Sequence, residues 1–206
     1  MYSSTIIVMV STPTGTRISL TQVKEFISGA SFKDMKLILL AILVWFRKHN
    51  LGNPFNYNRG FEFISALTHG FVLLPVGGGS DAVNPDDESD TREIKTCKYE
   101  LTKKGNEKSM GFTYNGTSRK PTLEEQKDYC HKKIMRDEYH IWDMIDYEKG
   151  ALVKSIKIKN TEVWCLIWEK WKKSWYNTGA ADPRIGGRVT TNDLKKNNVQ
   201  YEVINH

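Results

Sequence analysis

The chain has 206 residues, of which 39% are hydrophobic and 11% aromatic, which is enough apolar surface for one folded domain and excludes a disordered chain. Its three cysteines, Cys97, Cys130 and Cys165, are far apart and form no CxxC pair, which excludes a disulfide framework. The longest apolar run, residues 37–46, is about half the length of a membrane span. These features, and an N-terminus without a basic targeting region, lead us to expect a soluble cytoplasmic protein.

The net charge of +6 is unevenly distributed along the chain. Residues 1–148 carry 19 basic and 19 acidic side chains, whereas residues 149–206 carry 11 basic and 5 acidic ones. A basic surface of this kind attracts polyanions, and a nucleic-acid backbone is the partner that it favours. A lysine-rich face that is merely solvated is the alternative.

In chain order, the first third of the sequence predicts two short strands followed by helices. The strands, residues 6–10 and 17–20, flank the turn STPTGT. A helix over residues 21–28 follows, and the next helix begins after Ser31, which can cap it, and ends near His49. A third helix is expected in RGFEFISALTHG, closed by Gly70.

The rest of the sequence predicts alternating strands and helices. Strands over 91–101 and 108–114 flank the turn KKGNE, and a helix begins at Pro121. HIWDMID and ALVKSIKI then predict an antiparallel hairpin. In TEVWCLIWEKWKKSW, four tryptophans fall on one helical stripe, Trp164, Trp168, Trp171 and Trp175, which indicates core packing more than base stacking.

This order predicts an α/β (α+β) fold in a single domain over residues 1–206, with a central mixed β-sheet flanked by helices. We expect an N-terminal hairpin and helices over 1–57, a catalytic core over 58–176, and a basic tail over 177–206 that contacts DNA.

The stretch GGGSDAVNPDDESDTREIKTCK, residues 77–98, carries six acidic residues between Asp81 and Glu93. Side chains alternate along a strand, so Glu93 and Lys95 share one face. If residues 82–83 pair with 91–94 across the turn-forming NPDDESD, Asp81 returns to the neighbourhood of Glu93. Two carboxylates beside a lysine suit Mg²⁺, which takes oxygen ligands and often only one or two protein carboxylates. The lysine can orient and activate a water molecule.

Asp81 followed by Glu93-Ile94-Lys95 resembles the active-site signature of the PD-(D/E)XK nuclease superfamily, whose small members include the type II restriction endonucleases. The resemblance covers roughly residues 58–190, and it implies a restriction-endonuclease-like core and sequence-specific cleavage of double-stranded DNA. It implies Mg²⁺, for which Mn²⁺ can substitute, bound by Asp81, Glu93 and the main-chain carbonyl of Ile94. It also implies a further glutamate, Glu62, a homodimer on a short palindromic site, and a cognate DNA methyltransferase as a partner.

Two departures from that signature leave alternatives open. Ser80 stands where the family has proline, and a literal Pro-Asp occurs at Pro85-Asp86, which makes Asp86 the alternative first ligand. Glu93 and Lys95 also fit an ordinary charge pair on an exposed strand. A structure-selective or repair nuclease on the same core, and a non-catalytic DNA-binding protein, are the alternative functions.

Eight basic residues are the candidates for contacts with DNA, although each also fits a solvated surface charge. Two of them, Arg184 and Arg188, lie in the glycine-containing segment DPRIGGRVTTN, where arginine can bind a guanine edge. The eight are Lys98, Arg119, Lys172, Lys173, Arg184, Arg188, Lys195 and Lys196.

Overall fold

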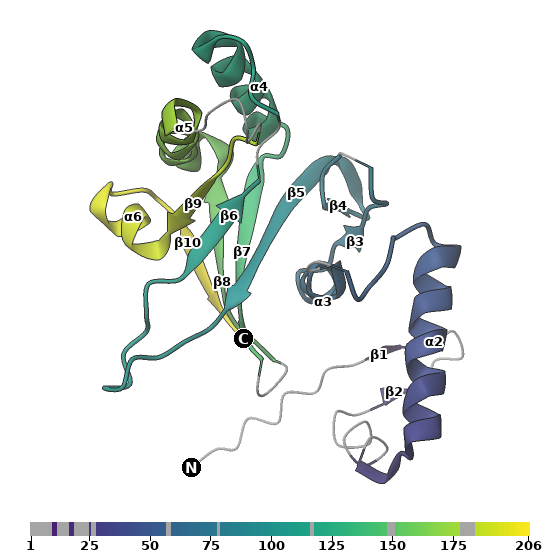
Figure 1. Cartoon of the computed structure of the whole chain (residues 1–206). Helices are drawn as coiled ribbons and strands as arrows, with labels where there is room; N and C mark the ends of the chain where they lie inside the picture. Colours follow the sequence, from purple (N-terminus) through teal and green to yellow (C-terminus); the bar gives the residue numbers. More distant parts are fainter. Residues whose placement is uncertain are drawn as a thin grey trace. The chain divides into compact units, whose positions relative to one another are not determined.

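The computed structural model describes residues 10–11, 17–18, 25, 28–56, 59–77, 79–115, 118–147, 151–177 and 184–206. The chain divides into two compact units, residues 1–49 and 50–206, which we describe separately (Figure 1). The single domain expected from the sequence stays a prediction.

The first unit contains a small hairpin and one long helix. Strand β1 (Val10–Ser11) pairs antiparallel with β2 (Arg17–Ile18). Of the strands expected over 6–10 and 17–20, the described residues include Val10, Arg17 and Ile18, and β1 extends one residue further, to Ser11. Helix α2 (Phe32–Lys48) begins after Ser31, which forms a capping box with Asp34, so the predicted cap is confirmed. The helix predicted over 21–28 lies outside the described residues, except for Glu25 and Ser28. In the part of the chain that the structure describes, no helix combines the length and apolar character needed to cross a membrane.

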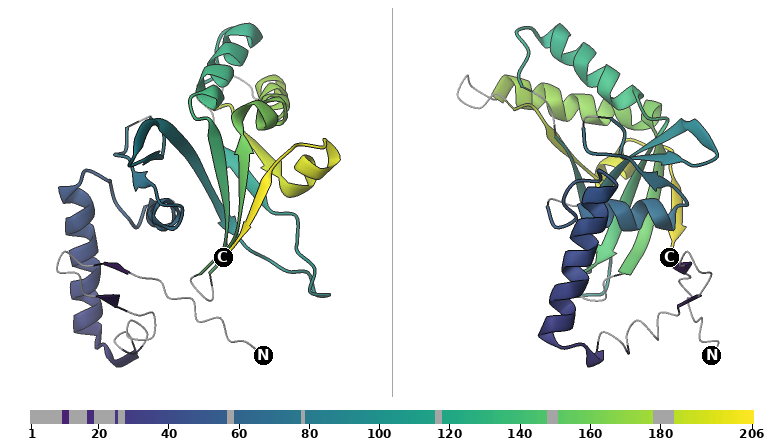
Figure 2. Two further views of the ribbon diagram at one scale, coloured as in Figure 1. Left: turned by 180° about the vertical axis from the view of Figure 1, so that it is seen from behind. Right: turned by 90° about the vertical axis from the view of Figure 1, so that its right-hand side faces the viewer.

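The second unit is built on a six-stranded mixed sheet in the order β10-β8-β7-β5-β4-β3 (Figures 1 and 2). Its strands are β3 (Val72–Leu73), β4 (Ala82–Asn84), β5 (Asp87–Lys98), β7 (Tyr139–Asp146), β8 (Ala151–Lys159) and β10 (Glu202–Asn205). The central pair β5–β7 is parallel and the other pairs are antiparallel. Parallel neighbours require a crossover connection, and here it contains β6 (Gly111–Tyr114) and α4 (Leu123–Met135). The mixed sheet with helices confirms the coarse fold class.

The main core lies on the face of the sheet that carries the crossover. Trp142 and Ile158 from the sheet pack there with Phe112 of β6, with Ile134 of α4 and with Trp171 of α5 (Asn160–Asn177). Helix α3 (Arg59–Thr68) packs against β3 and β5, and Phe61 on it stacks on Tyr147 beyond β7. Each face of the sheet is therefore covered by helix, which explains why most of β7 is buried.

The tryptophan stripe contributes to this core as predicted. Trp171 is fully buried, and Trp164, Trp168 and Trp175 are partly buried and pack against the core. Stacking between Trp164 and Trp168 occurs within the protein, with ring centroids 6.1 Å apart.

Two expectations about local structure need correction. Residues 184–206 are not a loose basic tail, because they form β9 (Gly187–Thr190), α6 (Thr191–Lys196) and β10, and β10 extends the main sheet beside β8. The acids after Pro85 are not all in a turn, because β5 begins at Asp87 and only Pro85 and Asp86 connect it to β4. A register shift at Val83/Asn84 allows this tight connection.

Candidate active site

The hairpin of β4 and β5 places Asp81 directly beside the middle of β5. Ala82 pairs with Arg92, and the backbone N–H of Asp81 donates to the carbonyl of Arg92 at 3.0 Å. The backbone N–H of Ile94 then donates to Oδ2 of Asp81 at 2.8 Å. The predicted return of Asp81 to Glu93 is confirmed, and backbone contacts hold the Asp81 carboxylate in position.

Lys95 connects the two carboxylates. Its Nζ lies 2.5 Å from Oε1 of Glu93 and 3.7 Å from Oδ2 of Asp81. The same ammonium donates to the carbonyl of Ile94 at 3.1 Å. The three charged side chains and the Ile94 carbonyl therefore surround one small volume, as the alternation along β5 predicts for Glu93 and Lys95.

Burial makes the two carboxylates electrostatically different. Loss of solvent raises the pKa of Asp81 to about 7, and the negative charges of Glu93 and Glu62 add to this shift against the attraction of Lys95. Burial also opposes ionisation of Glu93, but Lys95 and Arg136 outweigh it and hold the pKa of Glu93 below its ordinary value. Burial would likewise favour a neutral Lys95, yet its two carboxylate neighbours raise the pKa of the ammonium.

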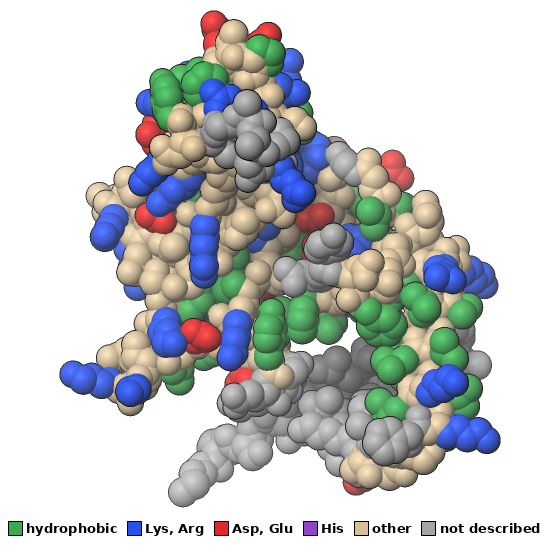
Figure 3. Space-filling model, viewed as in Figure 1, with side chains coloured by type: hydrophobic (Ala, Val, Ile, Leu, Met, Phe, Trp, Pro, Cys, Tyr) green, Lys and Arg blue, Asp and Glu red, His purple; other side chains and the backbone are tan. Residues whose placement is uncertain are grey.

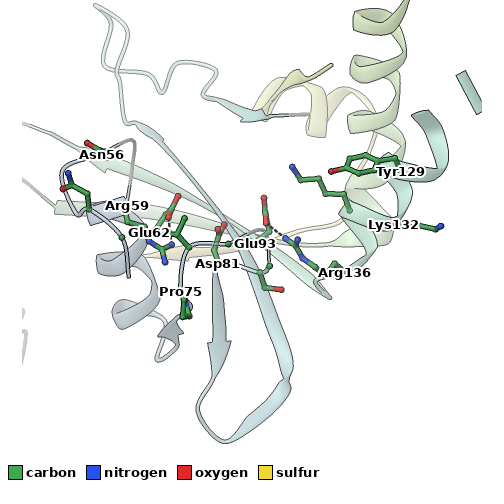
Figure 4. A pocket seen from close by; sticks show the side chains of 16 residues that line it. Asn56, Arg59, Glu62, Pro75, Asp81, Glu93, Tyr129, Lys132 and Arg136 are labelled. Carbon is green, nitrogen blue, oxygen red and sulfur yellow. Dashed lines mark hydrogen bonds and ion pairs between the residues drawn. The ribbon is translucent and has the colours of Figure 1, made fainter. Parts of the chain in front are cut away.

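Asp81 and Glu93 line a cavity of about 770 Å³ (Figure 4), whereas Lys95, which contacts both, is not among its lining residues. Asp81, Glu93 and Glu62 contribute acidic groups to its lining, and Glu62 is paired with Arg59 at 2.9 Å. Arg59 is anchored in turn, because its guanidinium also donates to the carbonyls of Leu51 and Leu74. Glu62, the further glutamate that the resemblance implies, thus shares the cavity with the other two carboxylates.

Helix α4 supplies the basic part of the lining. Tyr129, Lys132, Lys133 and Arg136 all line the cavity, and Figure 4 shows the Arg136 guanidinium reaching Glu93. That contact joins Nη2 of Arg136 to Oε2 of Glu93 at 3.0 Å. The four residues are spaced i, i+3, i+4 and i+7, which places them on one helical face.

Sequence reasoning missed this basic face, although the spacing of the four residues was visible in PTLEEQKDYCHKKIMRDE. The late position of the bases in the helix has an ordinary explanation, the favourable interaction with the helix dipole. Only the packing of α4 beside β5 shows that these side chains line the cavity.

None of the eight basic residues proposed for DNA contact is among the residues that line this cavity. Arg119 donates to the carbonyl of Trp175 at 2.6 Å and lies over its ring, which gives it a packing role. Lys98 pairs with Glu100 at 3.7 Å, and Lys172 pairs with Glu169 at 3.8 Å.

The other five candidates include two arginines whose surroundings the structure defines. Arg184 forms an isolated bridge with Ser118, and Arg188 on β9 packs closely over Gly111. The remaining three lie on the helices α5 and α6, where Lys173, Lys195 and Lys196 are exposed. Figure 3 shows many Lys and Arg side chains over the part of this unit that contains α4, α5 and α6.

Beneath Lys95, a buried polar network supports the site. Nδ1 of His140 lies 2.8 Å from the hydroxyl of Tyr114, which also accepts from Nε1 of Trp142 at 2.7 Å. Lys95 lies over the Tyr114 ring, 5.7 Å from its centroid. Burial lowers the pKa of His140 and raises that of Tyr114, so both stay neutral near pH 7, and their mutual contact gives His140 a structural role.

The oxygen atoms of Asp81, Glu93 and the Ile94 carbonyl are the candidate ligands for a Mg²⁺ ion. The described residues contain no group of three His, Cys, Asp or Glu side chains arranged to hold a metal ion. Asp81, Glu93 and the Ile94 carbonyl offer hard oxygen donors around one volume, and Mg²⁺ needs no more protein ligands than these. The residues therefore fit Mg²⁺.

The alternative ligand Asp86 does not reach this volume. It lies in the connection between β4 and β5, and its backbone N–H donates to Oδ1 of Asn84 at 3.0 Å. Seven residues of extended chain separate it from Glu93, a span of about 20 Å. Asp86 is also absent from the lining of the cavity.

The cysteines lie outside the lining of the cavity. Cys97, Cys130 and Cys165 are all free thiols in the structure. Burial raises the pKa of both Cys97 and Cys130 to about 12, and neither is a nucleophile near neutral pH.

Comparison of the chain with protein-family models finds no match, and comparison with curated proteins finds none either.

Proposed function

We propose that this protein is a Mg²⁺-dependent endonuclease that hydrolyses phosphodiester bonds of double-stranded DNA, on a core of the restriction-endonuclease type. The observation that carries the proposal is that Asp81 and Glu93, both paired with Lys95, line a cavity to which α4 contributes basic side chains. An acidic cluster alone would repel a phosphate. The basic side chains of α4 that line the same cavity can hold the phosphate close to a bound cation.

The fold supports the proposed family. The glutamate-bearing helix α3, the Asp81 hairpin, the Glu-x-Lys strand β5, the helix α4 and the hairpin β7–β8 follow one another in the order that the resemblance implies. Asp81 also contacts the Glu-x-Lys strand through the Ile94 backbone. This agreement in order and contact extends the resemblance beyond three residues of sequence.

Each residue has a distinct part in the proposed reaction. Asp81, Glu93 and the Ile94 carbonyl would hold Mg²⁺, and the ion would supply Lewis-acid polarisation of the phosphate. Lys95, kept protonated by its two carboxylate neighbours, donates hydrogen bonds that orient the attacking water and balance the phosphate charge. Lys132 and Lys133 on α4 bind the flanking phosphates.

In the reaction, the water oxygen forms a bond to phosphorus in line with the bond to the 3′ oxygen, which breaks. One proton of the water is released to solvent, and the departing 3′ oxygen takes up a proton from solvent to become a hydroxyl. The products are a 5′-phosphate and a 3′-hydroxyl, as the family resemblance implies.

The direct test is to incubate supercoiled plasmid with the protein and Mg²⁺, with and without a chelator. Discrete fragments that disappear with chelator support a sequence-specific endonuclease, and Mn²⁺ should restore cleavage. Cleavage of branched DNA with intact linear duplex would instead favour a structure-selective nuclease. Binding that leaves the plasmid intact with every metal would favour a non-catalytic DNA-binding protein.

Substitutions locate the activity in the site. Lys95→Ala should abolish cleavage while DNA binding remains, and Glu93→Gln should do the same. The matched controls are Lys104→Ala, at an exposed turn, and Glu88→Gln, at an exposed position on the same strand as Glu93. Cleavage by Lys95→Ala at the parental rate would refute the assignment. A homodimer on a palindromic site, with a partner methyltransferase protecting that site, remains part of the proposal.

A further inference from the structure

Arg136 forms an ion pair with Glu93, and a cation that binds to Glu93 would have to weaken or break that ion pair. The Lys95 ammonium pairs with Oε1 of Glu93, and the Arg136 guanidinium pairs with Oε2 at 3.0 Å. Both oxygens of the carboxylate are therefore engaged with protein cations. A carboxylate can bind Mg²⁺ only by giving up or sharing such contacts, because the ion competes with the ammonium and guanidinium for the same lone pairs.

Of the two cations, Arg136 is the one positioned to leave. Lys95 is 19% exposed and is held by Glu93, by Asp81 and by the Ile94 carbonyl. The Arg136 side chain is 30% exposed, lines the cavity and stands at the C-cap of α4. Its Nε is held by the buried carboxylate of Asp137 at 3.2 Å. The guanidinium can therefore exchange its Glu93 contact for one in the cavity while Asp137 keeps it near the site.

The charges at the site favour that exchange when a cation enters. The formal charges of Asp81, Glu93, Lys95 and Arg136 cancel in the arrangement described above. A divalent cation between the two carboxylates adds two positive charges, which leaves Arg136 repelled by the ion. Asp137 still pairs with Nε of Arg136. A phosphodiester entering the cavity can accept from the guanidinium nitrogens that Glu93 no longer engages, and guanidinium binds phosphate with two parallel hydrogen bonds.

We propose that Arg136 is a coupling residue with two positions, which pairs with Glu93 before Mg²⁺ binds and with a substrate phosphate once Mg²⁺ has bound. In the first position it competes with the metal for Glu93, and in the second it strengthens the binding of DNA. The inference rests on the proposed function, and it adds that metal and DNA bind cooperatively through this one side chain. By linkage, the factor by which bound metal raises the affinity for DNA equals the factor by which bound DNA raises the affinity for the metal.

The first measurement is a calorimetric titration of Mg²⁺ into the protein without DNA. Arg136→Gln removes the charge and keeps much of the side-chain volume, and it should bind Mg²⁺ about fivefold more tightly than the parent, since a partly exposed ion pair no longer competes. Lys132→Gln is the matched control, because Lys132 lies on the same face of α4 and has no contact with Glu93 among the ion pairs of the described residues. Its Mg²⁺ affinity should equal that of the parent.

The second measurement is the affinity for a DNA duplex by fluorescence anisotropy, with chelator and with Ca²⁺, which also takes oxygen ligands. A gel checks that the duplex stays intact. Ca²⁺ should tighten binding by the parent at least tenfold and by Arg136→Gln only about twofold. With Ca²⁺ present, the slope of log affinity against log salt concentration should be smaller for Arg136→Gln than for the parent. The difference should correspond to the loss of about one phosphate contact. Lys132→Gln should weaken binding equally with and without Ca²⁺.

The outcomes separate this inference from the proposed function. A parent protein that neither binds Mg²⁺ nor cleaves DNA overturns both. A parent that binds and cleaves, with an Arg136→Gln variant of unchanged or weaker Mg²⁺ affinity, overturns only the coupling role. Circular dichroism verifies that the variants are folded. If Arg136→Gln is unfolded, the titration with Mg²⁺ is made with Arg136→Lys instead. One lysine nitrogen cannot hold Asp137 and Glu93 as the guanidinium does, so this variant should bind Mg²⁺ about twofold more tightly than the parent, and an unchanged affinity would count against the role.

Discussion

Replacing Asp81 with asparagine should make the protein more stable when metal is absent. The Asp81 side chain is 22% exposed, and burial raises its pKa from 3.8 to about 7. A carboxyl group that keeps its proton in the folded state costs stability once the solution pH forces it to ionise. Asparagine keeps the oxygen that accepts the Ile94 N–H and carries no charge, so the variant avoids that cost.

The magnitude follows from the shift in pKa. Each pKa unit corresponds to about 1.4 kcal/mol, so a shift of about three units has a ceiling of roughly 4 kcal/mol. Partial exposure and the nearby ammonium of Lys95 reduce this, and we expect a gain of about 2 kcal/mol in the free energy of unfolding. The gain should be near zero at pH 4 or below, where Asp81 is protonated in both states. It should grow through pH 4–7 and be complete above pH 7.

The assay is urea unfolding followed by tryptophan fluorescence, from pH 4 to pH 8 with chelator present. The difference between variant and parent at each pH removes the contribution of titrating groups that do not interact with Asp81. Asp87→Asn is the control, because hydrogen bonds from Ser89 lower the pKa of Asp87, so this variant should lose rather than gain stability above pH 4. An Asp81→Asn variant that is no more stable than the parent at pH 8 would refute the reasoning.

Three further predictions address the metal, the buried network and α4. Mg²⁺ at 100 times its dissociation constant should stabilise the parent by about 2.7 kcal/mol in the same unfolding assay, and Glu93→Gln should lose most of this gain. Tyr114→Phe should cost about 1–3 kcal/mol in urea unfolding, because it leaves His140 and Trp142 without their shared hydroxyl partner; an unchanged midpoint would contradict this. Thr122→Ala removes the capping box of α4 and should cost about 1 kcal/mol by thermal unfolding, whereas an exposed control, Lys104→Ala, should cost nothing measurable.

Features that depend on neighbouring residues were predictable from the sequence. Alternation along one strand put Glu93 and Lys95 on the same face, and the turn residues after Val83 returned Asp81 to that strand. The same local logic located the cap at Ser31 and the buried stripe that contains Trp171. Each of these follows from a repeat of two or 3.6 residues, or from a side chain that bonds to its own backbone, and such patterns act within a few residues.

Tertiary packing decided what surrounds the carboxylates. Arg136 is 43 residues from Glu93 in sequence, and only the crossover between the parallel strands β5 and β7 brings α4 beside the site. The packing of α3 against β5 likewise brings Glu62 to the cavity. The strands formed by residues 184–206 were missed for the same reason, because β9 and β10 are short and gain their stability from β6 and β8.

The sequence by itself thus determined the chemical groups of the site, two carboxylates and a lysine on one hairpin, because that geometry is fixed by local backbone structure. The tertiary structure alone decided their electrostatic state and their neighbours, because burial and the approach of α4 depend on how distant elements pack. Burial raises the pKa of Asp81, whereas neighbouring cations hold the pKa of Glu93 below its ordinary value. The ion pair between Arg136 and Glu93 is the contact that a bound cation must displace.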